Sequence, residues 1–173
     1  MTKSALITTL AAAVLAGAAC NDSSSTAPEQ AQPTAVTDVV PAGGAAGVST
    51  TAPIRITFSH SMRAGMEAYV ALYQGPIATA NRVAGTPAWS PDRTMLTFTP
   101  AAPLVPHTTY SLHIGGGMMD ANGRPIDYSQ CQRLGGQQVM SGMMGGGMAG
   151  GMMGTGWQGA NGGYGMVFTF TTA

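Results

Sequence analysis

The side chains with the clearest chemical potential are six clustered methionines: Met140, Met143, Met144, Met148, Met152 and Met153. Their thioether sulfurs are soft donors, which suit a soft cation such as Cu(I) or Ag(I). Four further residues are expected near the base of this tract: His113, Cys131, Met118 and Met119. The tract lacks a regular Met-x-x-Met repeat, and methionine also fills irregular space without binding metal. Soft-metal binding is therefore one hypothesis, and an oxidisable filler of a glycine-rich tract is the alternative.

Other reactive residue types do not form a catalytic pattern. Serine and histidine occur, but the sequence has no nucleophile elbow and no serine–histidine–acid order. Glu29 and Glu67 are the only glutamates, which leaves little for a paired-carboxylate site. Asp120-x-Asn122-Gly123 resembles the start of a calcium loop but lacks the later glutamate, so it is interpreted as a turn. The sequence therefore predicts a protein that is not an enzyme, with no catalytic residues and no cofactor apart from the hypothetical soft metal.

Charged and titratable side chains are few. Only 8% of the residues are charged, against about a quarter in ordinary domains. Seven cationic side chains balance seven anionic ones, which gives no electrostatic footprint for nucleic acid. The three histidines, His60, His107 and His113, are expected to face solvent on separate strands or turns.

Residues 1–20 have the pattern of an export signal. Lys3 precedes an apolar run from Ala5 to Ala19, which is too short to span a bilayer comfortably. The run ends in LAGAAC, so Cys20 follows small residues as in a bacterial lipoprotein signal. We expect Cys20 to carry a lipid that anchors the protein to a membrane, and an ordinary secretory signal is the alternative. Cys131 is then the one remaining thiol, either free or paired between chains.

Residues 21–35 read NDSSSTAPEQAQPTA, a polar run without apolar periodicity. Such a segment buries too little surface to offset its ordering entropy. It is predicted to be a disordered tether, about 20 Å long on average. The tether holds a folded module, residues 36–173, away from a membrane surface.

The folded module is predicted to be all β. The stretch from Thr94 to Ile114 contains two segments of alternating apolar and polar residues, joined by a corner with three prolines. Similar segments recur and give about seven strands, at 36–40, 54–58, 68–73, 86–90, 94–99, 107–114 and 167–172. Seven short strands with frequent turn signals favour an immunoglobulin-like antiparallel β-sandwich. Its core is expected to contain Ile54, Ile56, Phe58, Leu96, Phe98, Tyr110, Leu112, Phe168 and Phe170.

An insert at residues 127–166 precedes the last predicted strand. Between Gly135 and Gly165 it has 14 glycines in 31 residues. Ordering that backbone costs roughly 30–60 kcal/mol, whereas burying its methionines and two aromatic residues returns about 25 kcal/mol. The entropy cost is larger, so the insert is predicted to be a disordered Gly/Met-rich loop.

Several short phrases of the module occur in a fixed order. They are Phe58-Ser59 with Met62, Thr97 to Pro100, Leu104 with Pro106 and Tyr110, Asp120 with Gly123, and Phe168 to Thr171. In these phrases the chain resembles the SbsA-type bacterial Ig-like domain, over residues 35–126 and 166–173. The resemblance implies a non-catalytic module of exported or cell-surface bacterial proteins and supplies no catalytic residues. We therefore expect an envelope-associated module for binding or structural display of an unknown protein or envelope partner, with Cu(I) or Ag(I) sequestration as the alternative.

Overall fold

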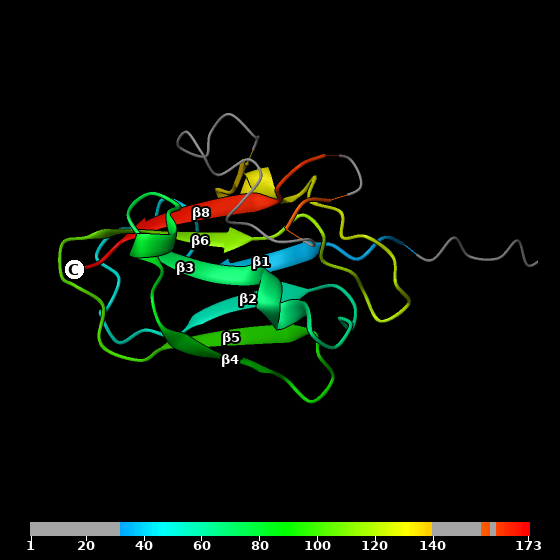
Figure 1. Cartoon of the computed structure of the whole chain (residues 1–173), viewed down its shortest axis with the longest axis horizontal. Helices are drawn as coiled ribbons and strands as arrows, with labels where there is room; N and C mark the ends of the chain where they lie inside the picture. The colour runs from blue at the N-terminus through cyan, green and yellow to red at the C-terminus, as the bar shows by residue number, and fades with distance from the viewer. Residues whose placement is uncertain (1–31, 140–156, 160–161) are drawn as a thin grey trace, which may run out of the picture. The chain divides into compact units, whose positions relative to one another are not determined.

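A computed structural model of the protein describes residues 32–139, 157–159 and 162–173. These residues form two antiparallel sheets of four strands each (Figure 1). The first sheet has the strand order β1-β2-β5-β4, and the second has the order β3-β6-β8-β7. The strands are β1 (Val36–Val40), β2 (Ile54–Phe58), β3 (Val70–Gln74), β4 (Gly85–Trp89), β5 (Met95–Pro100), β6 (Thr109–Ile114), β7 (Gln137–Gln138) and β8 (Met166–Thr171). Three 3₁₀ helices are η1 (Met66–Tyr69), η2 (Thr79–Asn81) and η3 (Cys131–Leu134). The all-β immunoglobulin-like prediction is confirmed, and β7 is the strand that the sequence did not predict.

The core lies between the two sheets, as predicted. The nine expected core residues are all buried, with at most 6% of any of them exposed. Leu96 of β5 faces Ile56 of β2, and Phe168 of β8 faces Leu112 of β6. Period-two alternation therefore identified the inward face of the four strands that carry these nine residues, β2, β5, β6 and β8. Within the described part of the chain, no helix is both long and apolar enough to cross a bilayer.

The proline corner between β5 and β6 is closed by a tyrosine. The backbone N–H of Val105 donates a hydrogen bond of 2.8 Å to the hydroxyl oxygen of Tyr110. Thr172 strengthens the same corner, because its Oγ1 donates to the Val105 carbonyl at 2.6 Å and accepts from the Thr108 N–H at 3.0 Å. Immunoglobulin-like sandwiches use such a tyrosine corner to fix the entry of a central strand.

The folded region begins before the boundary expected at residue 36. Thr34 is 0% exposed, and its Oγ1 donates to the carboxylate of Asp120 at 3.1 Å. Ala35 forms a parallel bridge with Asp127. The end of the predicted tether is therefore part of the sandwich, whereas residues 1–31, including Cys20, lie outside the described residues.

The outer face of the second sheet is covered. Ser111 and His113 point away from the core, yet they are 7% and 0% exposed. Ser111 Oγ donates to the Gly75 carbonyl at 2.7 Å, and the ring of His113 contacts the insert. The prediction that His113 faces solvent is therefore wrong, because alternation defines the side of the sheet but not what packs on it. His60 and His107 are exposed, as predicted.

The prediction of a disordered insert is wrong for its two ends. Residues Cys131–Leu134 form η3, and Gln137–Gln138 pair with β8 as strand β7. Val139 and Tyr164 are 2% and 8% exposed and pack together with Ile77 and Val167. Residues 140–156 and 160–161 lie outside the described residues.

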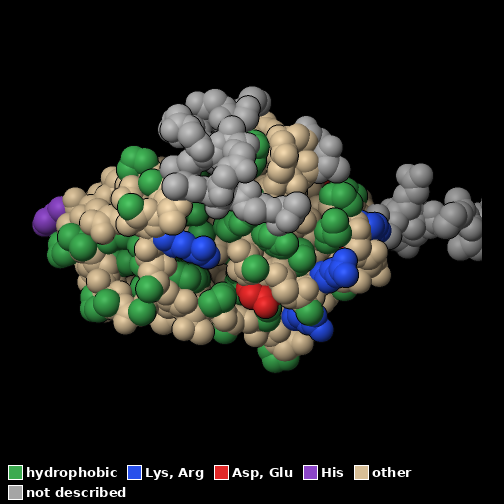
Figure 2. All heavy atoms as spheres, viewed as in Figure 1, with side chains coloured by type: hydrophobic (Ala, Val, Ile, Leu, Met, Phe, Trp, Pro, Cys, Tyr) green, Lys and Arg blue, Asp and Glu red, His purple; other side chains and the backbone are tan. Residues whose placement is uncertain are grey.

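The surface carries few charges, as the composition requires. On the face shown in Figure 2, basic side chains form separate spots among neutral and hydrophobic atoms. A chain with 8% charged residues has most of its surface available for neutral contacts.

Candidate functional site

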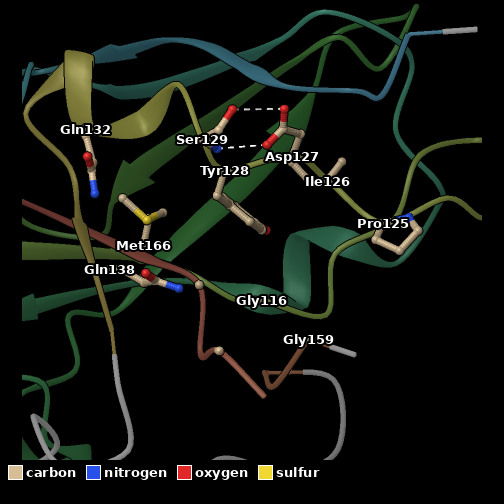
Figure 3. A pocket seen from close by; sticks show the side chains of 12 residues that line it. Gly116, Pro125, Ile126, Asp127, Tyr128, Ser129, Gln132, Gln138, Gly159 and Met166 are labelled. Carbon is tan, nitrogen blue, oxygen red and sulfur yellow. Dashed lines mark hydrogen bonds between the residues drawn. The ribbon is translucent and has the colours of Figure 1, made fainter. Parts of the chain in front are cut away.

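A groove of about 570 Å³ lies where the ends of the insert meet the loop at residues 125–129 (Figure 3). Tyr128 and Ser129 line one side, and Gln138 of the edge strand β7 and Met166 of the adjacent β8 line another. Gln132 of η3 completes the rim. Its volume is in the range of small-molecule and peptide sites.

Two polar side chains of the groove are held in place by the protein itself. The carboxylate of Asp127 accepts hydrogen bonds from the N–H and the hydroxyl of Ser129, at 2.8 and 3.0 Å. The hydroxyl of Tyr128 donates to the Gly115 carbonyl at 2.6 Å. Burial raises the pKa of Tyr128, so this phenol stays a neutral donor. Asp127 and Tyr128 thus form fixed walls.

Two primary amides of the groove remain available to a ligand. The side chains of Gln132 and Gln138 are exposed and make no hydrogen bond to other described residues. Each amide offers both a donor and an acceptor. Together with the apolar surface of Pro125 and Tyr128, they suit a neutral polar ligand such as a peptide segment.

The described residues show no sign of a catalytic or metal centre. Among residues 32–139, 157–159 and 162–173, no group of three or more His, Cys, Asp or Glu side chains could hold a metal ion. Asp127, the acidic residue of the groove, accepts a hydrogen bond from Ser129, and the described lining of the groove contains no histidine, cysteine or lysine.

His113 holds the C-terminal end of the insert against the second sheet. Its Nε2 lies 2.6 Å from the carbonyl oxygen of Tyr164, and its ring stacks on Trp157 with centroids 4.8 Å apart. Trp157 also packs edge-on against Tyr69 of η1, with ring centroids 6.0 Å apart. The Gly116 N–H donates to the Trp157 carbonyl at 2.8 Å. Burial lowers the pKa of His113 to about 4, although the Tyr164 carbonyl opposes this shift.

The residues expected near the base of the methionine tract lie in different places in the structure. His113 contacts the insert directly. Met118 is 0% exposed in the core between the sheets, and the backbone N–H of Met119 donates to the sulfur of Met66 at 3.2 Å. Met118 is therefore a core residue. The proposed ligands Met140, Met143, Met144, Met148, Met152 and Met153 lie outside the described residues.

Cys131 is a free thiol in the core. It is 0% exposed, so pairing between folded chains is not open to it. Burial, and secondly the Asp127 carboxylate, raises its pKa to about 12. The thiol therefore stays protonated and unreactive in the native protein.

The sequence analysis did not identify Gln132 and Gln138 as binding residues. Gln132 and Gln138 sit in a tract whose glycine content predicts disorder, so no structure was expected around them. Trp157 and Tyr164, the aromatic residues of the glycine-rich part between Gly135 and Gly165, were the available signal. Large aromatic side chains in a glycine-rich tract favour packing onto a neighbouring surface.

Several solved structures are similar to this chain at low identity. Domains 1–6 of the surface layer protein SbsC are 17% identical with a TM-score of 0.41, and the match covers 57% of this chain and 13% of that chain. PcoC, a methionine-rich copper resistance protein from Escherichia coli, is 14% identical with a TM-score of 0.46, and the match covers 82% of this chain and 100% of that one. L,D-transpeptidase 1 from Mycobacterium tuberculosis is 20% identical with a TM-score of 0.37, and the match covers 54% and 38%. Likenesses of this size carry no argument about activity.

The family is shown by the sequence match. No curated protein matches the chain. Residues 30–131, more than half of the chain, match the family described as bacterial Ig-like domain. This match agrees with the two four-stranded antiparallel sheets and with the tyrosine corner. The protein therefore belongs to the bacterial Ig-like domain family.

Proposed function

We propose that this protein is a non-catalytic module of the cell envelope that binds a partner through the groove beside β7. Domains of this family are typically non-catalytic, and an envelope or extracellular location fits them. The observation that carries the proposal is the pair of groove amides, Gln132 and Gln138, which have no hydrogen-bond partner among the described residues. Exposed amides beside apolar surface are typical of surfaces that recognise a neutral polar partner.

The N-terminal sequence supports attachment to a membrane. The apolar run before Cys20 has the composition of an export signal, and small residues precede the cysteine. A lipid on Cys20 gives the module a membrane anchor, with the polar segment after it as the tether. The partner is then a protein or other component of the envelope.

The groove is tested by capture of envelope components on the purified protein. Replacing both Gln132 and Gln138 by alanine is expected to lower the retention of the bound component at least tenfold, because two amide contacts at about 1 kcal/mol each are removed. Gln137→Ala is the matched control, since Gln137 is an exposed neighbour on β7 that does not line the groove. Equal retention by the double variant and the wild-type protein would show that the groove is not the binding site.

A second candidate function is sequestration of Cu(I) or Ag(I) by the methionine tract. The observation that favours it is that both flanks of the tract are fixed on the same sheet. The Val139 N–H donates to the Gly165 carbonyl at 2.9 Å, and the Trp157 carbonyl accepts from the Gly116 N–H at 2.8 Å. The six methionines lie between these two flanks in the sequence, and fixed flanks lower the entropy cost of gathering several sulfurs.

Soft-metal binding is tested by anaerobic titration with Cu(I) against a chelator of known affinity. Exchange of all six tract methionines for leucine keeps their size but removes sulfur, so Cu(I) affinity is expected to fall by at least a hundredfold. Met95→Leu on β5, outside the insert, serves as the control. An unchanged affinity in the sixfold variant would reject this function and leave the groove proposal intact.

A further inference from the structure

The docked insert requires a neutral His113. A carbonyl oxygen only accepts hydrogen bonds, so the 2.6 Å contact with Tyr164 places the ring proton on Nε2. Nδ1 then carries a lone pair and has no hydrogen-bond partner among the described residues. The side chain is 0% exposed. A second proton on Nδ1 would create both a buried charge and a buried donor without an acceptor, which is the costly combination in a protein interior.

The surroundings of His113 do not compensate that charge. Ala71 of β3 and Val167 of β8 are its neighbours in the sheet, and neither can ionise. The titratable groups of the adjacent elements are Tyr73 on β3, Tyr69 and Glu67 on η1, and Tyr164 in the insert. The carboxylate of Glu67 accepts a hydrogen bond from the indole N–H of Trp89 at 2.7 Å. Burial lowers the pKa of His113, and the Tyr164 carbonyl opposes that shift.

We propose that proton binding to His113 controls whether the Trp157 and Tyr164 segment stays docked on the second sheet. The neutral ring keeps its stacking and its hydrogen bond, and the charged ring is accommodated only after the segment has left and water reaches Nδ1. Gly159, Gly163 and Gly165 of the same segment line the groove, so release changes the groove as well. This inference holds whatever the groove binds.

The direction of the effect follows from the two protonation equilibria. An exposed imidazole has a pKa near 6.5, whereas burial lowers that of the docked His113 to about 4. Docking of the Trp157 and Tyr164 segment is therefore independent of pH well above 6.5. It becomes less favourable as the pH falls from about 6.5 to about 4. At pH 4.5 the docking equilibrium is expected to shift toward release by roughly 80-fold.

Hydrogen exchange followed residue by residue tests this proposal. Two amides report docking, namely Tyr164 N–H, which bonds to the Val139 carbonyl, and Gly116 N–H, which bonds to the Trp157 carbonyl. Amides of the β2–β5 ladder report global unfolding. After correction for intrinsic exchange rates, protection at Tyr164 and Gly116 should fall roughly 80-fold between pH 7.5 and 4.5. Because His113 also gains a proton when the whole chain unfolds, ladder protection falls as well; local release is shown by reporter amides that stay much less protected than the ladder amides at both pH values.

Matched variants separate His113 from other titrating groups. His113→Phe keeps an aromatic ring for Trp157 but cannot bind a proton, so the pH dependence at Gly116 should disappear. His107→Phe removes an exposed histidine and should behave as the wild-type protein does. The proposal fails if His113→Phe retains the pH dependence. It also fails if the reporter amides of the wild-type protein are as strongly protected as the ladder amides at pH 4.5, which would mean that they exchange only by global unfolding; this comparison remains decisive should His113→Phe not fold.

Discussion

Replacing Asp120 by alanine is expected to lower the free energy of unfolding by about 3 kcal/mol. Asp120 is 0% exposed, and one carboxylate oxygen accepts from the backbone N–H groups of Asn122 and Arg124 at 2.8 and 2.9 Å. The other oxygen accepts from Arg124 Nε at 2.9 Å and from Thr34 Oγ1 at 3.1 Å. Alanine leaves these donors without an acceptor. The free-energy cost of a buried, unsatisfied donor is larger than the net contribution of the hydrogen bond that is lost.

The same carboxylate gives stability a defined pH dependence. Burial opposes ionisation of Asp120, but the hydrogen bonds from Arg124, Asn122 and Thr34 outweigh it and lower the pKa. Because the unfolded carboxyl has the higher pKa, about 3.9, this stabilisation is complete above that pH. It is lost as the pH falls through the lower pKa of the folded state.

Denaturant unfolding at pH 7 and at pH 3 measures both effects. Asp120→Asn retains one acceptor oxygen and the shape of the side chain, so it should lose less stability than Asp120→Ala at pH 7. It should also lack the component of stability that Asp120 loses in acid. If Asp120→Ala unfolds within about 0.5 kcal/mol of the wild-type protein, the carboxylate does not hold the turn together.

Replacing Gly165 by alanine is expected to cost about 3 kcal/mol of stability. Gly165 has a φ of 86°, which is unfavourable for a residue with a Cβ atom. An added Cβ would also lie 1.9 Å from the carbonyl oxygen of Ile114 and 2.6 Å from the nitrogen of Gly116. These are backbone atoms at the end of β6, so they cannot rotate away, and the segment must leave the sheet.

Gly162→Ala is the matched control for that substitution. Gly162 has a similar φ of 79°, but the nearest atom to its added Cβ is Gln158 Nε2 at 4.0 Å. Its expected cost is backbone strain alone, about 1 kcal/mol. Thermal or urea unfolding measures both variants, and Trp157 fluorescence reports whether the segment is still docked. Equal losses in the two variants would contradict the close approach of Gly165 to β6.

Alternation and turn chemistry were sufficient to predict the sandwich. Leu112 alternates with Ser111 and His113, and it meets Phe168 across the β6–β8 ladder in the core. The spacing from the proline corner to Tyr110 matches the hydroxyl contact with Val105. These features depend on neighbours in the sequence or on one buried face, which is the information that a local pattern carries.

The ends of the insert were mispredicted because glycine was counted only as a source of entropy. In the structure, glycines let separate backbones approach closely. The Gly43 N–H donates to the Leu134 carbonyl at 3.1 Å, and a Cβ on Gly43 would lie 2.2 Å from the Gly135 oxygen. Residues far apart in the sequence therefore make contacts that offset part of the conformational entropy lost on ordering. The composition of a segment does not reveal these contacts.

The sequence by itself determined the class of fold, the inward faces of β2, β5, β6 and β8, the proline corner and the turn at Asp120, because each follows from local periodicity or turn geometry. It also provided the export pattern around Cys20 and the clustered thioethers. Only the tertiary structure showed that His113 is buried under Trp157 and Tyr164, and that the Gln132 and Gln138 amides share a groove. Both features depend on which distant segment covers the outer face of a sheet, and side-chain alternation along one strand carries no information about that partner.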